Sequence, residues 1–222
     1  MASRIAAIWA AGSEDFRQRG FLFLGGILTD GLGGIQDELL NQGKGIIREA
    51  GKGTDEAVTS GGIAGDGRAQ DGNSYYKGIE SHVQLYDKDL LVYRIDYNEY
   101  TGGAHGIYMA TFLNMDLTLM RPLRLDDIFV GDYKDALTDL IWNQLMADNK
   151  VNTHEALEDM GYASTGDIAP TENFYLSKEG ITFYYNVYDI TPYSMGPVKV
   201  TIPFSMMEHL LGSNPILGEL KN

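Results

Sequence analysis

Two stretches of alternating side chains in the middle of the chain constrain its fold more than any other feature. In residues 79–85 and 91–97, mainly apolar side chains at odd positions alternate with mainly polar side chains at even positions. Successive side chains of a β-strand point to opposite faces of a sheet, so this period of two predicts two strands. The polar turn Asp87-Lys88-Asp89 between them predicts a β-hairpin. Residues 107–114 predict a third strand, and three consecutive strands favour an antiparallel meander.

A helix and a second group of strands are predicted in the remaining half of the chain. The helix is expected to begin with Asp132 as its N-cap and to end near Asn149. Its buried stripe consists of apolar residues at helical spacing: Leu137, Leu140, Ile141 and Leu145. Shorter helices are predicted at about 155–160 and 204–211, and strands at 174–176, 181–188 and 198–202. Strands, then a helix, then strands without regular alternation predict an α+β fold, an antiparallel β-sheet with a few packed helices.

Glycine is concentrated in the first part of the chain. Seventeen of the 27 glycines precede position 80. Glycine raises the entropic cost of ordering a segment, so only a weak helix is predicted at about 35–50, followed by a loop at 51–72.

Composition narrows the classes of partner and chemistry. The formal net charge of -14 repels phosphate backbones and favours a cationic partner, so nucleic acid is not an expected partner. The chain has no cysteine, which excludes disulfides, thiolate nucleophiles and iron–sulfur ligation by its own residues. It also contains no run of about 18 apolar residues, so no membrane-spanning segment is predicted.

The sequence lacks the common motifs that carry catalysis or bind metals. It contains no HExxH, EF-hand, Gly-x-Ser-x-Gly or Walker pattern. Asp126 and Asp127 are interpreted as helix-capping residues instead of a cation site. We therefore predict no cofactor, no metal and no catalytic residues. The competing hypothesis is an enzyme in which His105 and a nearby aspartate act as acid and base.

Four ordered stretches resemble a bacterial extracytoplasmic domain family. They are Tyr100-Thr101-Gly102-Gly103-Ala104-His105-Gly106, residues 123–129, residues 180–196 and residues 200–204. The family includes regions of the lysozyme-responsive anti-sigma factor RsiV and of the peptidoglycan deacetylase PdaC, outside its catalytic domain. Asp189 and Thr191 stand where the family more often has glutamate and alanine.

The resemblance implies an architecture, a cellular location and a role. The architecture is two consecutive α+β subdomains, residues 1–113 and residues 114–222. The implied location is the periplasm or the cell surface, often as a lipoprotein. Export to this location requires a signal sequence, which is not visible in these residues. The implied role is a binding or sensing module of the cell envelope that recognises a lysozyme-like protein or a cell-wall glycan.

The candidate ligand-binding residues belong to two of these stretches: Tyr100, Gly102, Gly103, His105, Tyr188 and Tyr193. Exposed tyrosines are good anchors for a partner, and glycines allow a partner to approach closely. A structural interpretation stays open, in which the glycines only permit positive φ in a tight turn and the tyrosines only pack on the sheet. A third hypothesis is an accessory domain that packs on another subunit through an exposed apolar patch.

Overall fold

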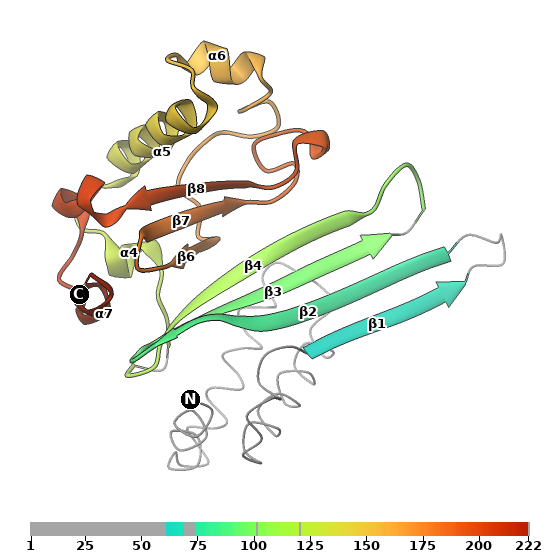
Figure 1. The fold of residues 1–222 in the computed structure, drawn as a ribbon, viewed down its shortest axis with the longest axis horizontal. Coiled ribbons are helices and arrows are strands. Elements are labelled where there is room, and N and C mark those ends of the chain that lie inside the picture. Colours follow the sequence, from blue (N-terminus) through green and yellow to red (C-terminus); the bar gives the residue numbers. More distant parts are fainter. Residues whose placement is uncertain (1–60, 69–73, 101, 120, 222) are drawn as a thin grey trace.

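A computed structural model describes residues 61–68, 74–100, 102–119 and 121–221 (Figure 1). These residues form two antiparallel sheets, one long helix and several short helices, which confirms the predicted α+β class. The helix predicted at 35–50 lies outside the described residues. No helix within the described residues is long and apolar enough to cross a membrane.

The first sheet has five strands in the order β1-β2-β3-β4-β5. Their bounds are β1 (Gly61–Arg68), β2 (Ser74–Asp87), β3 (Leu90–Tyr100), β4 (Ile107–Asp116) and β5 (Arg121–Pro122). The predicted hairpin and third strand are confirmed as β2, β3 and β4. The predicted loop is wrong between residues 61 and 68, because β1 pairs along its whole length with β2. Pairing with β2 gives the backbone N–H and C=O groups of β1 their hydrogen-bond partners, even though glycine has a low intrinsic propensity for strands.

The second sheet has three strands in the order β6-β7-β8. They are β6 (Phe174–Leu176), β7 (Gly180–Tyr185) and β8 (Val198–Pro203). All six residues of the central strand β7 are buried. The prediction that this strand continues to Tyr188 is wrong. The backbone N–H of Asp189 donates to the carbonyl oxygen of Asn186 (3.1 Å), and this turn directs the chain away from the sheet.

The helices are α4 (Leu125–Ile128), α5 (Lys134–Asn149), α6 (His154–Asp159) and α7 (Pro215–Leu220). The buried stripe of α5 is confirmed for Leu137, Ile141 and Leu145, whereas Leu140 is only half-buried. Asp132 is not the N-cap of α5, because Tyr133 occupies that position. The Tyr133 ring is buried and its hydroxyl donates to Oδ1 of Asp126 (2.6 Å), which fixes where the helix begins.

The helix predicted over 204–211 is replaced by two 3-10 turns, Phe204–Met206 and Glu208–Leu210. The side chains of Phe204, Met207 and Leu210 are buried, and they recur every third residue. This spacing matches the three residues per turn of a 3-10 helix.

Asparagine side chains join the two sheets along β4 and β6. Nδ2 of Asn114 donates to the carbonyl oxygen of Phe174 (2.8 Å), and Leu176 N–H donates to Oδ1 of Asn114 (2.9 Å). Asn173 bonds in the same way to the backbone of Ala110 and Phe112. In Figure 1 the strands therefore follow one another from β8, β7 and β6 to β4, β3, β2 and β1.

A third asparagine completes this contact, which we call the asparagine joint (Asn114, Asn173 and Asn186). The backbone N–H of Ala110 donates to Oδ1 of Asn186 (2.7 Å). The joint holds the end of β7 against β4, and β4 itself runs across residue 113. The division into subdomains 1–113 and 114–222 stays a prediction.

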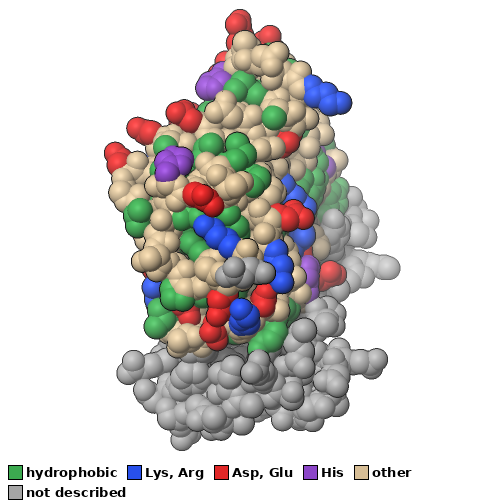
Figure 2. All heavy atoms as spheres, turned by 60° about the vertical axis from the view of Figure 1, so that its left-hand side comes forward, with side chains coloured by type: hydrophobic (Ala, Val, Ile, Leu, Met, Phe, Trp, Pro, Cys, Tyr) green, Lys and Arg blue, Asp and Glu red, His purple; other side chains and the backbone are tan. Residues whose placement is uncertain are grey.

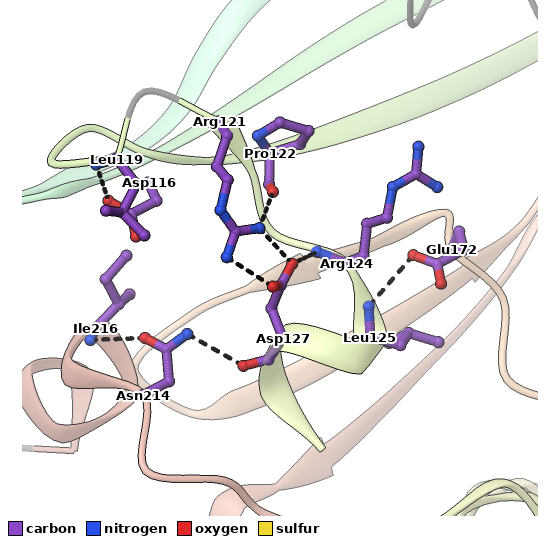
Figure 3. Close-up of polar contacts among 10 residues, drawn as sticks. All are labelled: Asp116, Leu119, Arg121, Pro122, Arg124, Leu125, Asp127, Glu172, Asn214 and Ile216. Carbon is purple, nitrogen blue, oxygen red and sulfur yellow. Dashed lines mark hydrogen bonds and ion pairs between the residues drawn. The ribbon is translucent and has the colours of Figure 1, made fainter. Parts of the chain in front are cut away.

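A polar network around α4 ties together distant parts of the chain (Figure 3). Arg121 donates two hydrogen bonds to the carboxylate of Asp127, at 2.8 and 2.7 Å. Asp127 also accepts from the backbone N–H of Arg124 (2.9 Å), which confirms the interpretation of this aspartate as a capping residue. Nδ2 of Asn214 donates to the carbonyl oxygen of Asp127 (3.2 Å) and so links the segment before α7 to α4.

This network predicts a pH-dependent contribution to stability. The pKa of Asp127 is lowered, first by the hydrogen bond from Arg121, so its contribution is present above the usual value of 3.8 and is lost as the pH falls through the folded value. Asp127→Asn is expected to lower the free energy of unfolding by up to about 1 kcal/mol at neutral pH, since Arg121 is partly exposed. Urea unfolding should show this difference near pH 7 and none near pH 2. An equal difference at both pH values would contradict the assignment.

Candidate binding surface

The turn between β3 and β4 is shaped by two glycines and by hydrogen bonds to its backbone. Gly102 and Gly103 have φ values of 96° and 99°, a conformation that residues with a Cβ rarely adopt. The hydroxyl of Tyr100 donates to the carbonyl oxygen of Gly103 (2.9 Å). Nδ1 of His105 donates to the carbonyl oxygen of Gly106 (3.1 Å). Gly102, Gly103 and Tyr100 therefore shape the turn, as the structural interpretation of this motif expects.

The segment 186–197 between β7 and β8 presents two of the predicted tyrosines. Tyr188 adopts a φ of 71°, which is unusual for a residue with a side chain. Two interactions hold the neighbouring residues: Oδ2 of Asp189 accepts from the backbone N–H of Asn186 (2.6 Å), and Asn186 bonds to β4 through the asparagine joint. Burial raises the pKa of Asp189, while the hydrogen bond from Asn186 lowers it. Tyr193 lies in the 3-10 turn Tyr193–Met195 that follows.

Gly166 supports the same segment from its other side. A Cβ on this glycine would lie 2.3 Å from the carbonyl oxygen of Asp189, so only glycine permits this close approach. The residues next to Tyr188 are thus held between β4 and the chain around position 166. The backbone that carries Tyr188 is fixed before any partner arrives, which lowers the entropic cost of binding.

His105, Tyr188 and Tyr193 are brought together by the fold. The rings of His105 and Tyr193 stack with centroids 3.7 Å apart and planes at 12°. The hydroxyl of Tyr188 lies 3.3 Å from Nε2 of His105. Because Nδ1 donates to Gly106, Nε2 of a neutral imidazole is the acceptor for this hydroxyl. Residues 83 positions apart in the sequence therefore form one cluster.

Tyr108, which sequence reasoning did not select, completes the cluster. Its ring meets Tyr193 edge to face, with centroids 5.7 Å apart and an angle of 71°. We call His105, Tyr108, Tyr188 and Tyr193 the aromatic surface. Tyr108 was missed because its position at the start of β4 indicates only a strand residue, and its contact with Tyr193 depends on the asparagine joint.

Most of the aromatic surface is exposed, because only Tyr193 of its four residues is half-buried. The exposed fraction is 47% for Tyr188 and 40% for Tyr108. Met195, in the same 3-10 turn as Tyr193, is also exposed. Ile107 is exposed as well, but it precedes Tyr108 on β4 and therefore points to the opposite face of the strand. Tyrosine and methionine are enriched in the buried centres of protein interfaces. The surface has the composition of a docking site.

The exposed face at the other end of the molecule differs in character. The aromatic surface lies on the side where β3 turns into β4 and β7 ends, on the right in Figure 1. Figure 2 brings the left-hand side forward, and there Asp and Glu side chains are dispersed among polar ones, with hydrophobic side chains in small groups. Scattered apolar side chains of this kind are ordinary on protein surfaces.

The arrangement around His105 offers contact area but no acid–base pair. No carboxylate among the described residues bonds to His105, whose ring contacts are the Gly106 carbonyl, Tyr188 and Tyr193. In the same described part of the chain, no three His, Asp or Glu side chains are grouped so that they could hold a metal ion. The geometry therefore supports packing against a partner and gives no support to catalysis by His105.

Comparison with known proteins gives a match in the second half of the chain. The family model described as "Protein of unknown function (DUF3298)" matches residues 126–205. This range contains α5, α6 and β6 to β8 with the segment that carries Tyr188 and Tyr193, but not the turn that carries His105. A search of the curated proteins found no match.

Two solved structures of DUF3298 proteins are similar to this chain. A crystal structure of a family member from Bacteroides fragilis matches with 83% sequence identity and a TM-score of 0.65, over 66% of this chain and 58% of that chain. A family protein from Pseudomonas aeruginosa matches with 22% identity and a TM-score of 0.52, over 61% of each chain, and shows the fold alone. This chain thus spans about three fifths of the length of either protein. Residues 126–205 are a DUF3298 domain, whose function is unknown.

Proposed function

We propose that this chain is an extracytoplasmic binding module of the bacterial cell envelope, which docks a basic protein on its aromatic surface. The observation that carries the proposal is the cluster of the exposed His105, Tyr108 and Tyr188 around the half-buried Tyr193, held in place by the asparagine joint and by Gly166. Preorganised aromatic side chains are the usual anchors of a protein interface.

The charge of the chain supports a basic partner. A formal net charge of -14 attracts a positively charged protein and speeds its association. The resemblance to the extracytoplasmic domain family of the lysozyme-responsive anti-sigma factor also supports a basic partner. Lysozyme is therefore the first partner to test, and export to the periplasm or cell surface is part of the proposal.

A cell-wall glycan is the second candidate. Exposed tyrosine rings offer flat apolar faces, and tyrosine hydroxyls offer donors and acceptors to the hydroxyl groups of sugars. The exposure of Tyr108 and Tyr188 favours this candidate as well. It differs from the first in its dependence on salt, because a glycan gains little from the net charge of the chain.

Calorimetric titration of the chain with lysozyme and with peptidoglycan fragments tests the proposal. Binding to lysozyme is expected, and it should weaken by about tenfold or more between roughly 0.05 and 0.3 M salt, because screening shortens the reach of the charges. Binding to the fragments alone, with little dependence on salt, would select the glycan candidate. Absence of binding to both would contradict the proposal.

A further inference from the structure

Two cations lie over adjoining aromatic rings next to the asparagine joint. Cζ of Arg94 is 5.5 Å from the ring centroid of Phe112, and Nζ of Lys199 is 5.7 Å from that of Tyr184. The rings of Phe112 and Tyr184 are themselves 5.1 Å apart. Arg94 pairs with Phe112 between β3 and β4, and Tyr184 pairs with Lys199 between β7 and β8. The two sheets thus contribute one cation and one ring each to a single face.

Hydrogen-bond donors exceed acceptors on this face. Tyr184 is only 4% exposed, yet its hydroxyl makes no hydrogen bond to another described residue. Buried hydroxyl groups normally have a partner, either a protein group or water, so this hydroxyl can still donate to an acceptor from outside the chain. Burial raises the pKa of Tyr184, which keeps the hydroxyl protonated and able to donate at neutral pH.

The two cations also retain capacity for an acceptor. Arg94 donates from Nε and Nη2 to Oδ1 of Asp96, at 2.9 and 2.5 Å, and its Nη1 has no acceptor in the described part of the chain. Lys199 is exposed and forms no ion pair with a described carboxylate. Asp96 offsets the charge of Arg94, and the exposed Glu80 lies opposite Asp96 in the β2–β3 pairing, so Lys199 is the cation of this face that no described carboxylate pairs.

We infer that Arg94, Tyr184 and Lys199 form a subsite for a single carboxylate group of the bound partner. A carboxylate carries one negative charge and can accept several hydrogen bonds, which matches the three available donors and the unpaired Lys199. The apolar group next to the carboxylate would lie on the rings of Phe112 and Tyr184.

The subsite deepens the proposed function because it adjoins the aromatic surface. Tyr108 lies on β4 four residues before Phe112, on the same face of the strand, and its ring contacts Tyr193. A partner docked on the aromatic surface can therefore extend along β4 to the subsite. The carboxylate could belong to a peptide terminus or side chain, or to a sugar acid.

Titration with small carboxylates, followed by NMR chemical shifts of the chain, tests the inference. The probes are N-acetyl-alanyl-alanine with its C-terminal amide, and glucuronate with glucose. Each carboxylate is expected to shift resonances of β7 and β8 more than its neutral counterpart does. A response to the peptide carboxylate alone assigns the source to protein, and a response to glucuronate assigns it to glycan. Equal shifts from charged and neutral probes would overturn the inference.

Substitutions locate the response. Lys199→Gln removes the charge at an exposed position and is expected to weaken binding of the responding carboxylate by about tenfold, as for a charge-assisted hydrogen bond. Tyr184→Phe keeps the ring but removes the hydroxyl, and it should weaken binding of the carboxylate by a similar factor. Lys221→Gln is the matched control, because Lys221 also lies over a ring, that of Phe204 at 5.6 Å. Equal effects of Lys199→Gln and Lys221→Gln would contradict the subsite.

Failure of the subsite and failure of the proposed function give different results. If small carboxylates do not bind while lysozyme or peptidoglycan fragments do, the subsite is wrong and the aromatic surface stands. If carboxylates bind with the expected dependence on Lys199 while both larger partners fail, the proposed function is wrong and the subsite remains.

Discussion

Gly180→Ala is expected to lower the free energy of unfolding by about 4 kcal/mol or more, within the range of the most damaging single substitutions. Gly180 begins β7 with a φ of 156°. A Cβ there would lie 2.1 Å from the carbonyl oxygen of Ile202 and 2.9 Å from Cα of Pro203. Both are backbone atoms of β8, so moving a side chain cannot relieve the clash.

Urea unfolding of the wild type and two glycine variants measures this effect. Gly218→Ala is the matched control, because a Cβ on Gly218 would meet no atom within 4 Å and alanine favours the α7 helix. We expect the control to be as stable as the wild type or slightly more stable. A Gly180→Ala variant that unfolds together with the control would show that the β7–β8 pairing differs from the structure.

Asn114→Ala is expected to lower the free energy of unfolding by about 3 to 5 kcal/mol. Asn114 is 2% exposed, and its amide takes the place of a strand partner for the backbone of Phe174 and Leu176. Alanine leaves one buried carbonyl oxygen and one buried N–H without a partner, each at a cost of about 1 to 3 kcal/mol, and also leaves a small cavity. The loss should appear as a lower urea midpoint with an unchanged slope.

Two further substitutions separate the hydrogen bonds from other causes. Asn143→Ala on the exposed side of α5 is the control and should change stability by less than about 0.5 kcal/mol. Asn114→Asp keeps the acceptor for Leu176 but cannot donate to Phe174, so it should also be strongly destabilising. If Asn114→Ala is as stable as the control, the asparagine joint is not what holds the two sheets together.

Local patterns were sufficient for most of the elements. The alternation in residues 79–97 predicts the β2–β3 hairpin because half-buried strands of an antiparallel sheet need a period of two. The stripe on α5 was equally predictable from helical spacing. The positive φ values of Gly102 and Gly103 were also predictable, because they depend only on the missing Cβ of each glycine and not on contacts with distant residues.

Features that depend on contacts between distant residues could not be predicted. An asparagine that bonds to the backbone of a strand about 60 residues away has no local signature, so the asparagine joint was not foreseen. Tyr188 was assigned to a sheet face because the sequence around it alternates, but the turn after Tyr185 moves it to the surface.

The candidate site was predicted only in part, because some of its contacts also join residues that are distant in the sequence. His105, Tyr188 and Tyr193 were selected from their motifs, and the fold does bring them together. Their stacking, and the addition of Tyr108, follow from the way the joint places β4 beside the segment 186–197. Whether these residues bind a partner remains a proposal.

Titration of surface variants with the partner that binds the wild type tests the central claim most directly. Tyr188→Ala and Tyr193→Ala are each expected to weaken binding by about 30-fold, or about 2 kcal/mol, as for anchors at the centre of an interface. Met206→Ala removes an equally exposed hydrophobic side chain elsewhere and should bind as the wild type does. Tyrosine variants that stay folded and bind with unchanged affinity would show that the partner docks on another surface.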